Sequence, residues 1–194
     1  MLGRYGSHLI YVPSSGPPPA GYVKLWDTRL DSWINMAAAG PSMVGTNIGP
    51  CMSYPPALAT EARASFVVPF DYIHGSPLLL RCRYDTDADA LAGNVAKMES
   101  RGARIIAGTV LDDPPTFAQE SYEEDWVVSP AVQGTVWSPY MYITDANGQI
   151  NGVDVGEGDE VHVILARNLV GDTVTSNVRV RVGTVEVYQL VGGP

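Results

Sequence analysis

The clearest pattern in the chain is the alternation of apolar and polar residues in its last third. In residues 158–167, Val161, Val163 and Leu165 share one face, and Gly158 with Asp159 precedes them. Val and Ile at every second position, bounded by turn residues, are typical of a β-strand with one buried face. This segment therefore predicts a strand of a β-sandwich.

The phase of the alternation changes inside residues 177–190. The apolar residues before and after Gly183 are Val178, Val180 and Val182, then Val185 and Val187. A shift of one residue in a period of two turns every side chain to the other face of the sheet. Gly183 is therefore predicted to be a bulge, a bend or a crossover between sheets.

Similar alternation continues upstream, in residues 61–69, 77–84, 94–111 and 132–144. Asp145 to Gly148 is predicted to be a tight turn, because Asn-Gly tolerates positive φ at both central positions. Seven or eight strands with long, uneven connections predict an all-β jelly-roll or Greek-key sandwich. The expected core is Ala64, Phe66, Val68, Leu78, Leu80, Cys82, Tyr84, Ile105, Ala107, Leu111, Trp137, Met141 and Ile143.

Residues 1–60 differ from the rest and are predicted to form an extended arm before a sandwich of residues 61–194. They hold eight of the fifteen prolines, and such clusters favour extended backbone over helices and central strands. Residues 22–36 could form a short β-hairpin, which we favour, or one amphipathic helix. Trp26, Leu30 and Trp33 need something to pack against, either the sandwich or a neighbouring subunit.

Composition excludes several classes of protein. The net charge is −9, with twelve basic and twenty-one acidic residues, which argues against nucleic acid as a partner. We expect no membrane span and no signal peptide, because no run approaches the roughly twenty apolar residues that a span needs. Cys51 and Cys82 form no CxxC motif, so neither a disulfide framework nor structural zinc is indicated, and Cys82 is interpreted as a buried thiol.

The pattern of strand and turn residues over residues 61–191 resembles a jelly-roll domain of structural proteins in tailed phages and related viruses. The resemblance rests on residues 64–72, 75–81, 93–95, Gly158-Asp159 with Arg167, and 185–188. It contains no active-site motif. It implies a non-enzymatic virion protein without a cofactor, made in the host cytoplasm and placed on the capsid exterior.

That resemblance leaves two roles open. The first is a decoration or cement protein that binds the major capsid protein or other virion proteins as a homotrimer. A proline-stiffened arm favours this role, because it loses less entropy when it lies across a partner. The second is a carbohydrate-binding or host-recognition module of a head or tail fibre. Its sugar-stacking residues would be Tyr122, Trp126 and Tyr140.

Three other groups of residues resemble known kinds of site. Asp85, Asp87 and Asp89 begin like a calcium loop, but Ala90 and Ala96 replace the Gly and Glu of an EF-hand, so only a looser calcium site is left. The acids at 120 and 123–125 share one loop, which gives no reason for the two different pKa values of a glycosidase. The scattered His8, His74 and His162 support neither a zinc site nor a catalytic triad.

The last candidate is a basic ladder of Arg81, Arg83, Arg179 and Arg181. Each pair lies at i and i+2 on a predicted strand, so each projects two guanidinium groups from one face. If the two strands share a sheet, the four charges gather into one patch. Carboxylates such as Glu99 and Glu186 would offset them, or the ladder docks on an acidic surface of the capsid or of a neighbouring copy.

Overall fold

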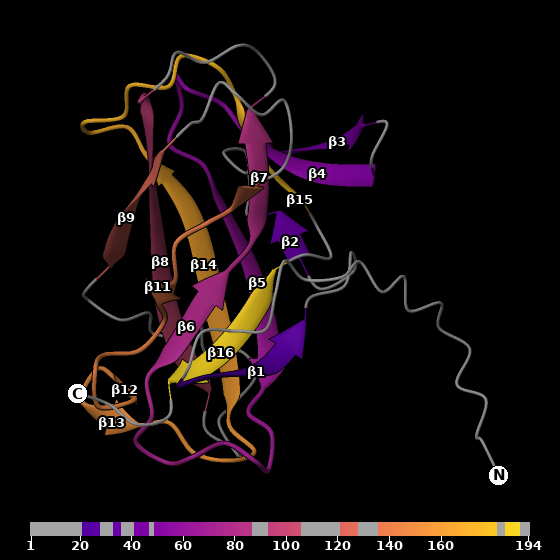
Figure 1. Cartoon of the computed structure of the whole chain (residues 1–194). Coiled ribbons are helices and arrows are strands. Elements are labelled where there is room, and N and C mark those ends of the chain that lie inside the picture. The colour runs from indigo at the N-terminus through magenta and orange to yellow at the C-terminus, as the bar shows by residue number, and fades with distance from the viewer. Residues whose placement is uncertain are drawn as a thin grey trace, which may run out of the picture.

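The chain forms a sandwich of two β-layers (Figure 1). This computed structural model describes residues 21–27, 33–35, 41–46, 49–86, 93–105, 121–127, 136–181 and 185–190. Within these ranges no helix is present, and so none that is long and apolar enough to cross a membrane.

The front layer consists of two sheets placed end to end. Their strand orders are β1-β16-β6-β11 and β10-β7-β15-β4-β3. Only Cys82 separates β6 from β7, so the sheets join there. The strands are β1 (Tyr22–Asp27), β3 (Ser42–Thr46), β4 (Gly49–Tyr54), β6 (Leu78–Arg81), β7 (Arg83–Thr86), β10 (Val136–Trp137), β11 (Met141–Tyr142), β15 (Val178–Arg181) and β16 (Glu186–Leu190).

The back layer is one sheet in the order β2-β5-β14-β8-β9, and a separate hairpin, β12-β13, lies at one end of the sandwich. All pairings in the back layer are antiparallel. The strands are β2 (Trp33–Asn35), β5 (Glu61–Val67), β8 (Val95–Ile105), β9 (Tyr122–Val127), β14 (Glu160–Asn168), and, in the hairpin, β12 (Gln149–Ile150) and β13 (Val153–Asp154).

The order of these strands confirms the predicted jelly roll. In the front layer β4 lies beside β15, β15 beside β7, and β7 beside β10; facing them, β5 lies beside β14, β14 beside β8, and β8 beside β9. The chain therefore alternates between layers as two Greek keys do in a jelly roll. The described part of this fold is held together mainly by long-range strand pairs.

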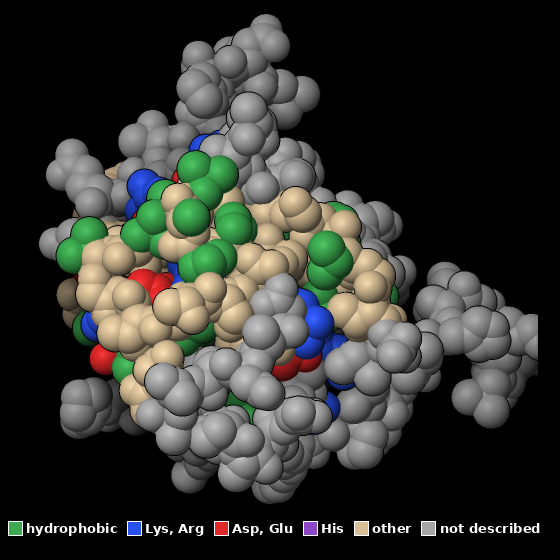
Figure 2. Space-filling view, turned by 90° about the horizontal axis from the view of Figure 1, so that it is seen from above, with side chains coloured by type: hydrophobic (Ala, Val, Ile, Leu, Met, Phe, Trp, Pro, Cys, Tyr) green, Lys and Arg blue, Asp and Glu red, His purple; other side chains and the backbone are tan. Residues whose placement is uncertain are grey.

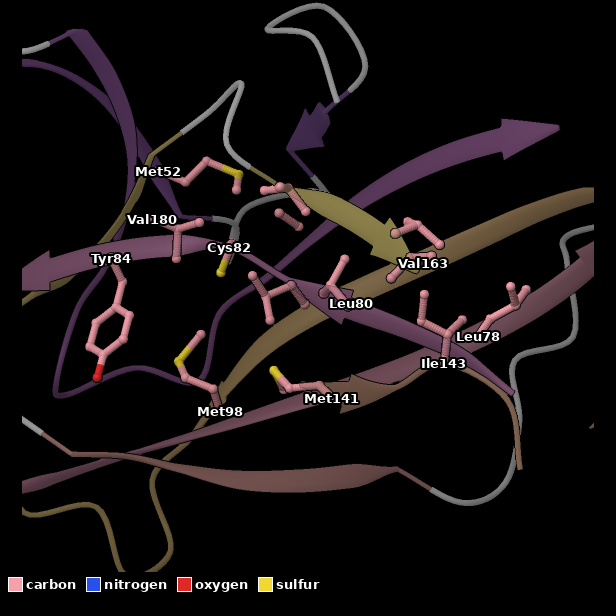
Figure 3. Close-up of a cluster of buried hydrophobic side chains, with 14 of the residues drawn as sticks. Met52, Leu78, Leu80, Cys82, Tyr84, Met98, Met141, Ile143, Val163 and Val180 are labelled. Atoms are coloured by element: carbon pink, nitrogen blue, oxygen red, sulfur yellow. The ribbon is translucent and has the colours of Figure 1, made fainter. Parts of the chain in front are cut away.

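The core between the layers confirms most of the predicted inward positions. Leu78, Leu80, Cys82 and Tyr84 point inward from β6 and β7, and they meet side chains of the back layer (Figure 3). Three methionines fill the gaps among the strands, as flexible thioether side chains commonly do. They are Met52, Met98 and Met141.

One glycine sets how closely the layers approach. Gly102 of β8 faces Ile143, and an added Cβ would lie 2.5 Å from the Ile143 backbone oxygen. A larger residue would therefore push the layers apart. Next to it, the Ser100 hydroxyl donates a hydrogen bond of 2.6 Å to the Tyr142 carbonyl, which ties β8 to β11.

The predicted turn at Asp145 to Gly148 is confirmed, but its geometry differs from the expectation. The Gly148 N–H donates to the Asp145 carbonyl at 3.1 Å, and only Gly148 of the pair Asn147-Gly148 has positive φ. The turn with positive φ at both central residues is Asn151-Gly152, at 54° and 73°, which joins β12 to β13. An Asn-Gly pair closing a two-residue hairpin is the expected chemistry for this turn.

The predicted boundary at residue 60 is wrong for the described residues. β4 pairs with β15 inside the front layer, and Cys51, Met52 and Tyr54 are buried. The prolines at 55 and 56 follow this strand instead of interrupting it, so their density does not mark an arm. Residues 1–20, 28–32, 36–40 and 47–48 of the predicted arm lie outside the described residues.

Residues 22–27 and 33–35 of the predicted hairpin or helix form strands, so the helical alternative is wrong, and the hairpin is wrong as well. β1 pairs with β16 in the front layer, whereas β2 pairs with β5 in the back layer. Trp26 and Trp33 therefore belong to strands of different layers, and Leu30 lies outside the described residues. Gly183 also lies outside them, but β15 and β16 belong to different sheets, as the phase change predicts.

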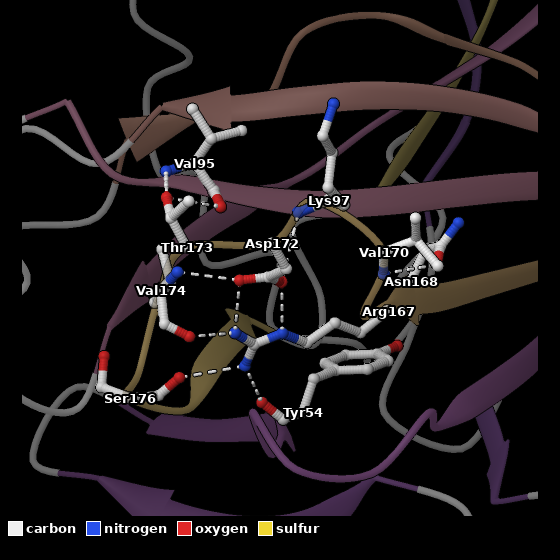
Figure 4. Close-up of polar contacts among 10 residues, drawn as sticks. All are labelled: Tyr54, Val95, Lys97, Arg167, Asn168, Val170, Asp172, Thr173, Val174 and Ser176. Carbon is white, nitrogen blue, oxygen red and sulfur yellow. Dashed lines mark hydrogen bonds and ion pairs between the residues drawn. The ribbon is translucent and has the colours of Figure 1, made fainter.

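One end of the sandwich is fastened by a buried arginine (Figure 4). Arg167, near the end of β14, donates all five of its N–H groups: two to the Asp172 carboxylate, at 2.8 and 2.9 Å, and three to the carbonyls of Tyr54, Ser176 and Val174, at 2.9, 2.9 and 2.6 Å. The side chains of Arg167 and Asp172 are almost completely buried. This ion pair therefore fixes the β14–β15 connection against the end of β4.

Candidate functional site

The predicted basic ladder lies on neighbouring strands of the front layer. β7 pairs with β15, which brings Arg83 and the pair Arg179 and Arg181 onto one sheet. Arg81 ends β6, one residue before the Cys82 junction. Because Cys82, Tyr84, Val178 and Val180 are buried, the arginines between them project from the outer side of this layer.

Two of these arginines pack on aromatic rings. The guanidinium carbon of Arg81 lies 4.8 Å from the centroid of the Trp137 ring and 4.7 Å from that of Tyr140, and the same carbon of Arg83 lies 4.8 Å from Trp137. The Arg81 Nη1 also donates to the Tyr140 hydroxyl at 3.2 Å. All four side chains are partly exposed. We call Arg81, Arg83, Trp137 and Tyr140 the arginine–aromatic surface.

Trp137 was expected on the core side, together with Met141 and Ile143, and this is wrong. Trp137 belongs to β10, which pairs with β7 so that Trp137 stands opposite Arg83. The segment 138–140 separates β10 from β11 and changes the phase, so Met141 is buried whereas Trp137 is not. Its indole Nε1 is buried without a hydrogen bond to any described residue. The sequence feature that comes nearest to predicting this surface is the Arg81-Cys82-Arg83 spacing, which places two arginines on the outer side of the strand that pairs with Trp137.

A carboxylate engages Arg179, whereas the carboxylates expected to offset the ladder contact other residues. Arg179 Nε donates to the Asp85 carboxylate at 2.6 Å, and Arg179 Nη2 to the Thr86 carbonyl at 3.0 Å. Glu186, which stands opposite Arg81 in the strand register, receives Lys24 Nζ at 3.3 Å and the Tyr188 hydroxyl. Burial and this carboxylate raise the pKa of Tyr188. Glu99, the other expected partner, contacts Arg101 of the back layer instead, at 3.6 Å.

The predicted calcium residues are not brought together by the described structure. Asp85 lies in β7 and is engaged by Arg179, while Asp87 and Asp89 lie outside the described residues. No group of three or more His, Cys, Asp or Glu side chains suited to a metal ion occurs in the described ranges.

The three predicted sugar-stacking residues lie in separate places. Trp126 is fully buried, with its ring 4.6 Å from that of Tyr84, so it cannot offer a face to a sugar. Tyr122 packs 5.6 Å from Tyr142, and Tyr140 packs edge-on 5.2 Å from Tyr188. The acidic residues 123–125, predicted as a loop, belong to β9, where alternation turns Trp126 inward and Glu123 and Asp125 outward.

The outer side of the back layer carries charges that are paired with each other. Arg63 and Arg101 flank the buried Ile164 in the strand register, and both reach the Glu61 carboxylate, at 3.5 and 3.4 Å. Lys97 contacts Glu123, at 3.4 Å, and Asp125. The hydrogen bonds of Lys97 to these acids raise its pKa. The charges on this side therefore pair with one another across the strands of the back layer.

Hydrophobic side chains are exposed at both ends of the sandwich. Figure 2 shows them gathered on the end that Arg167 fastens, where the connections before β5 and after β14 carry Leu58, Leu169 and Val170. At the opposite end the β5–β6 connection carries Phe70, which is 87% exposed, and Ile73. Periodicity did not predict these residues as sites, because they lie in connections.

No protein-family model and no curated protein matches the chain. Among solved structures, the chain is similar to a carbohydrate-binding module specific for non-crystalline cellulose, with 12% sequence identity and a TM-score of 0.37. The match covers 82% of this chain and 86% of that chain. A similarity this weak assigns no ligand to the present protein.

Proposed function

We propose that the chain is a non-enzymatic structural protein of a virion that decorates the capsid exterior and docks on an acidic surface of a neighbouring virion subunit. The observation that carries this proposal is the arginine–aromatic surface. The virion setting rests on the jelly-roll resemblance in the sequence, and the described fold is compatible with it.

The chemistry of this surface suits a protein partner. Arg, Trp and Tyr are the residues most enriched among those that dominate binding energy at protein interfaces. A guanidinium group that already rests on aromatic rings loses little conformational freedom when a carboxylate binds its edge. On a chain with net charge −9, clustered arginines also direct an acidic partner to one face.

The contact of the N-terminal arm with the head surface, which the sequence predicts for residues 1–60, is proposed as a second point of attachment. The proposed assembly is a homotrimer, because decoration proteins of this kind commonly occupy threefold sites, as the resemblance implies.

The test is reconstitution on particles that lack this chain. The variant Arg81→Gln/Arg83→Gln removes two charges from the arginine–aromatic surface, and Arg63→Gln/Arg101→Gln removes two from the back layer. The first should weaken particle binding about tenfold or more, with reduced dependence on salt, and the second should bind like the wild type. Equal occupancy for the first variant and the wild type would refute the proposal.

A second candidate is recognition of an anionic polysaccharide, and the position of Tyr140 and Trp137 beside two arginines favours it. Aromatic rings stack on sugar rings, and guanidinium groups bind carboxylates or sulfates. A glycan array that contains uronic-acid and sulfated glycans separates the two proposals. Binding that disappears in Arg81→Gln/Arg83→Gln would favour the glycan, and an empty array would leave the protein partner.

A further inference from the structure

The most exposed large hydrophobic side chain in the described residues is Phe70, in the β5–β6 connection, at 87% exposure. Val67, Ile73 and Val153 are exposed at the same end of the sandwich, where the β12–β13 hairpin lies (Figure 1). Exposing a phenylalanine to water is unfavourable, and an apolar cluster of this kind commonly marks an interaction site. We call Val67, Phe70, Asp71, Ile73 and Val153 the Phe70 end.

The turn that carries Phe70 is held firmly by buried side chains. The Ile73 N–H donates to the Gln189 side-chain oxygen at 2.8 Å, and the buried Tyr72 hydroxyl donates to the Ser76 carbonyl at 2.6 Å. The Tyr72 N–H closes the turn on the Pro69 carbonyl at 3.1 Å. Phe70 is thus presented by a preorganised loop, which lowers the entropy that binding would cost.

Acidic groups surround these apolar side chains. Asp71, Asp154 and Glu157 are exposed, and Asp154 lies 3.8 Å from the ring of His74. Glu157 is next to Gly158, whose N–H bonds the Val68 carbonyl at 2.9 Å, so it borders the same loop. The Phe70 end is therefore apolar in its centre and acidic around it.

We infer that the Phe70 end of one copy docks on the arginine–aromatic surface of a second copy. The Phe70 ring packs against the arginine–aromatic surface, and the neighbouring Asp71 carboxylate binds a guanidinium group there. This inference rests on the proposed function, because it names another copy of the chain as the acidic partner of the same surface.

Charge decides the geometry of this association. Two Phe70 ends would bring carboxylates against carboxylates, and two arginine–aromatic surfaces would bring arginines together, so a symmetric face-to-face dimer is disfavoured by either pairing. The Phe70 end of one copy therefore meets the arginine–aromatic surface of another, either reciprocally in a twofold dimer or head to tail. We infer the head-to-tail arrangement, which closes into a ring when the rotation between copies permits. A ring of this kind accounts for the expected trimer.

The experiment is a mass measurement by light scattering on the full-length chain and on two variants. Phe70→Ser/Asp71→Asn removes the Phe70 end, and Arg81→Gln/Arg83→Gln removes the arginine–aromatic surface. Each variant alone should be monomeric, whereas an equimolar mixture should form a one-to-one dimer, since each partner supplies the half that the other lacks. Val170→Ser, at the opposite end of the sandwich, is the control and should assemble like the wild type.

A wild type that stays monomeric over the whole accessible concentration range would overturn the inference, as would assembly of Phe70→Ser/Asp71→Asn alone or a mixture that fails to pair. Thermal melting confirms that each variant is folded. If the wild type is monomeric yet still binds particles through Arg81 and Arg83, the self-association fails while the proposed function stands. If particle binding is also unaffected by the arginine variant, both fail.

Discussion

Arginine serves opposite purposes in two regions of this molecule. Arg167 is buried at one end of the sandwich, and its five N–H donors are engaged by Asp172 and three carbonyls (Figure 4). Arg81 and Arg83 are partly exposed on the front layer, where their guanidinium groups pack on aromatic rings. The first arrangement consumes the hydrogen-bonding capacity of the guanidinium group inside the fold, whereas the second orients the group at the surface.

The difference predicts which arginines matter for stability and which for binding. Removing one partner of a buried, hydrogen-bonded pair leaves uncompensated polar groups in the interior. Removing a partly exposed arginine loses packing on a ring, hydrogen bonds that water can partly replace, and a small electrostatic contribution. The two regions can therefore be separated by measuring unfolding and binding on the same variants.

The largest effect is expected at Arg167. Arg167→Met leaves the Asp172 carboxylate buried without its cation and three carbonyls without donors, so the free energy of unfolding should fall by about 3–5 kcal/mol. Urea unfolding followed by tryptophan fluorescence measures this. A loss no larger than that of a surface arginine would contradict the structural role of the ion pair.

The labelling rate of Cys82 measures the same loss of stability in a second way. Burial raises the pKa of its thiol to about 12, so at neutral pH the group in the folded protein is protonated as well as inaccessible. Labelling by a thiol reagent should therefore require opening of the fold, and Arg167→Met should accelerate it roughly a hundredfold or more. Mass spectrometry of peptides containing Cys82 gives the rate. Fast labelling of the wild type would contradict the buried position.

A smaller effect on stability is expected at the arginine–aromatic surface. Arg81→Gln/Arg83→Gln should lower the free energy of unfolding by only about 1 kcal/mol, because cation–π contacts at partly exposed positions are weak. Cys82 labelling should accelerate by no more than about fivefold, far less than in Arg167→Met, although Cys82 lies between the two substituted residues. A melting temperature as low as that of Arg167→Met would show that this surface is structural.

The smallest effect is expected on the back layer. Arg63→Gln/Arg101→Gln breaks the contacts with Glu61, but these side chains are partly exposed and such pairs are typically worth under about 1 kcal/mol. Neither unfolding nor particle binding should change appreciably. Loss of particle binding in this variant would move the docking surface to the back layer.

Period-two alternation was sufficient to predict the layers and much of the core. Val161, Val163 and Leu165 face inward as expected, because each strand of a sandwich has one dry face. In residues 122–127 three consecutive acids indicate a loop, but these residues form a strand. Trp126, predicted to stack on a sugar, therefore faces the core. The acidic composition of this segment indicates a loop, although two of the acids, Glu123 and Asp125, are outward-facing residues of a strand.

The candidate sites were less predictable, since they depend on which strands become neighbours. Arg81 and Arg83 could be placed on an outward face, but their contact with Trp137 arises from the pairing of β10 with β7 and from the change of phase after it. The network of Arg167 joins residues 54 and 167–176, which only the closed sandwich brings together. Phe70 lies in a connection, where no periodicity applies.

The most direct test of the central claim is a near-atomic map of the assembled particle that contains this chain. The account predicts that Arg81, Arg83 and Trp137 are buried against an acidic neighbour, with carboxylates at hydrogen-bonding distance from the guanidinium groups. A map in which this surface faces solvent, while the chain is attached through the back layer, would contradict it.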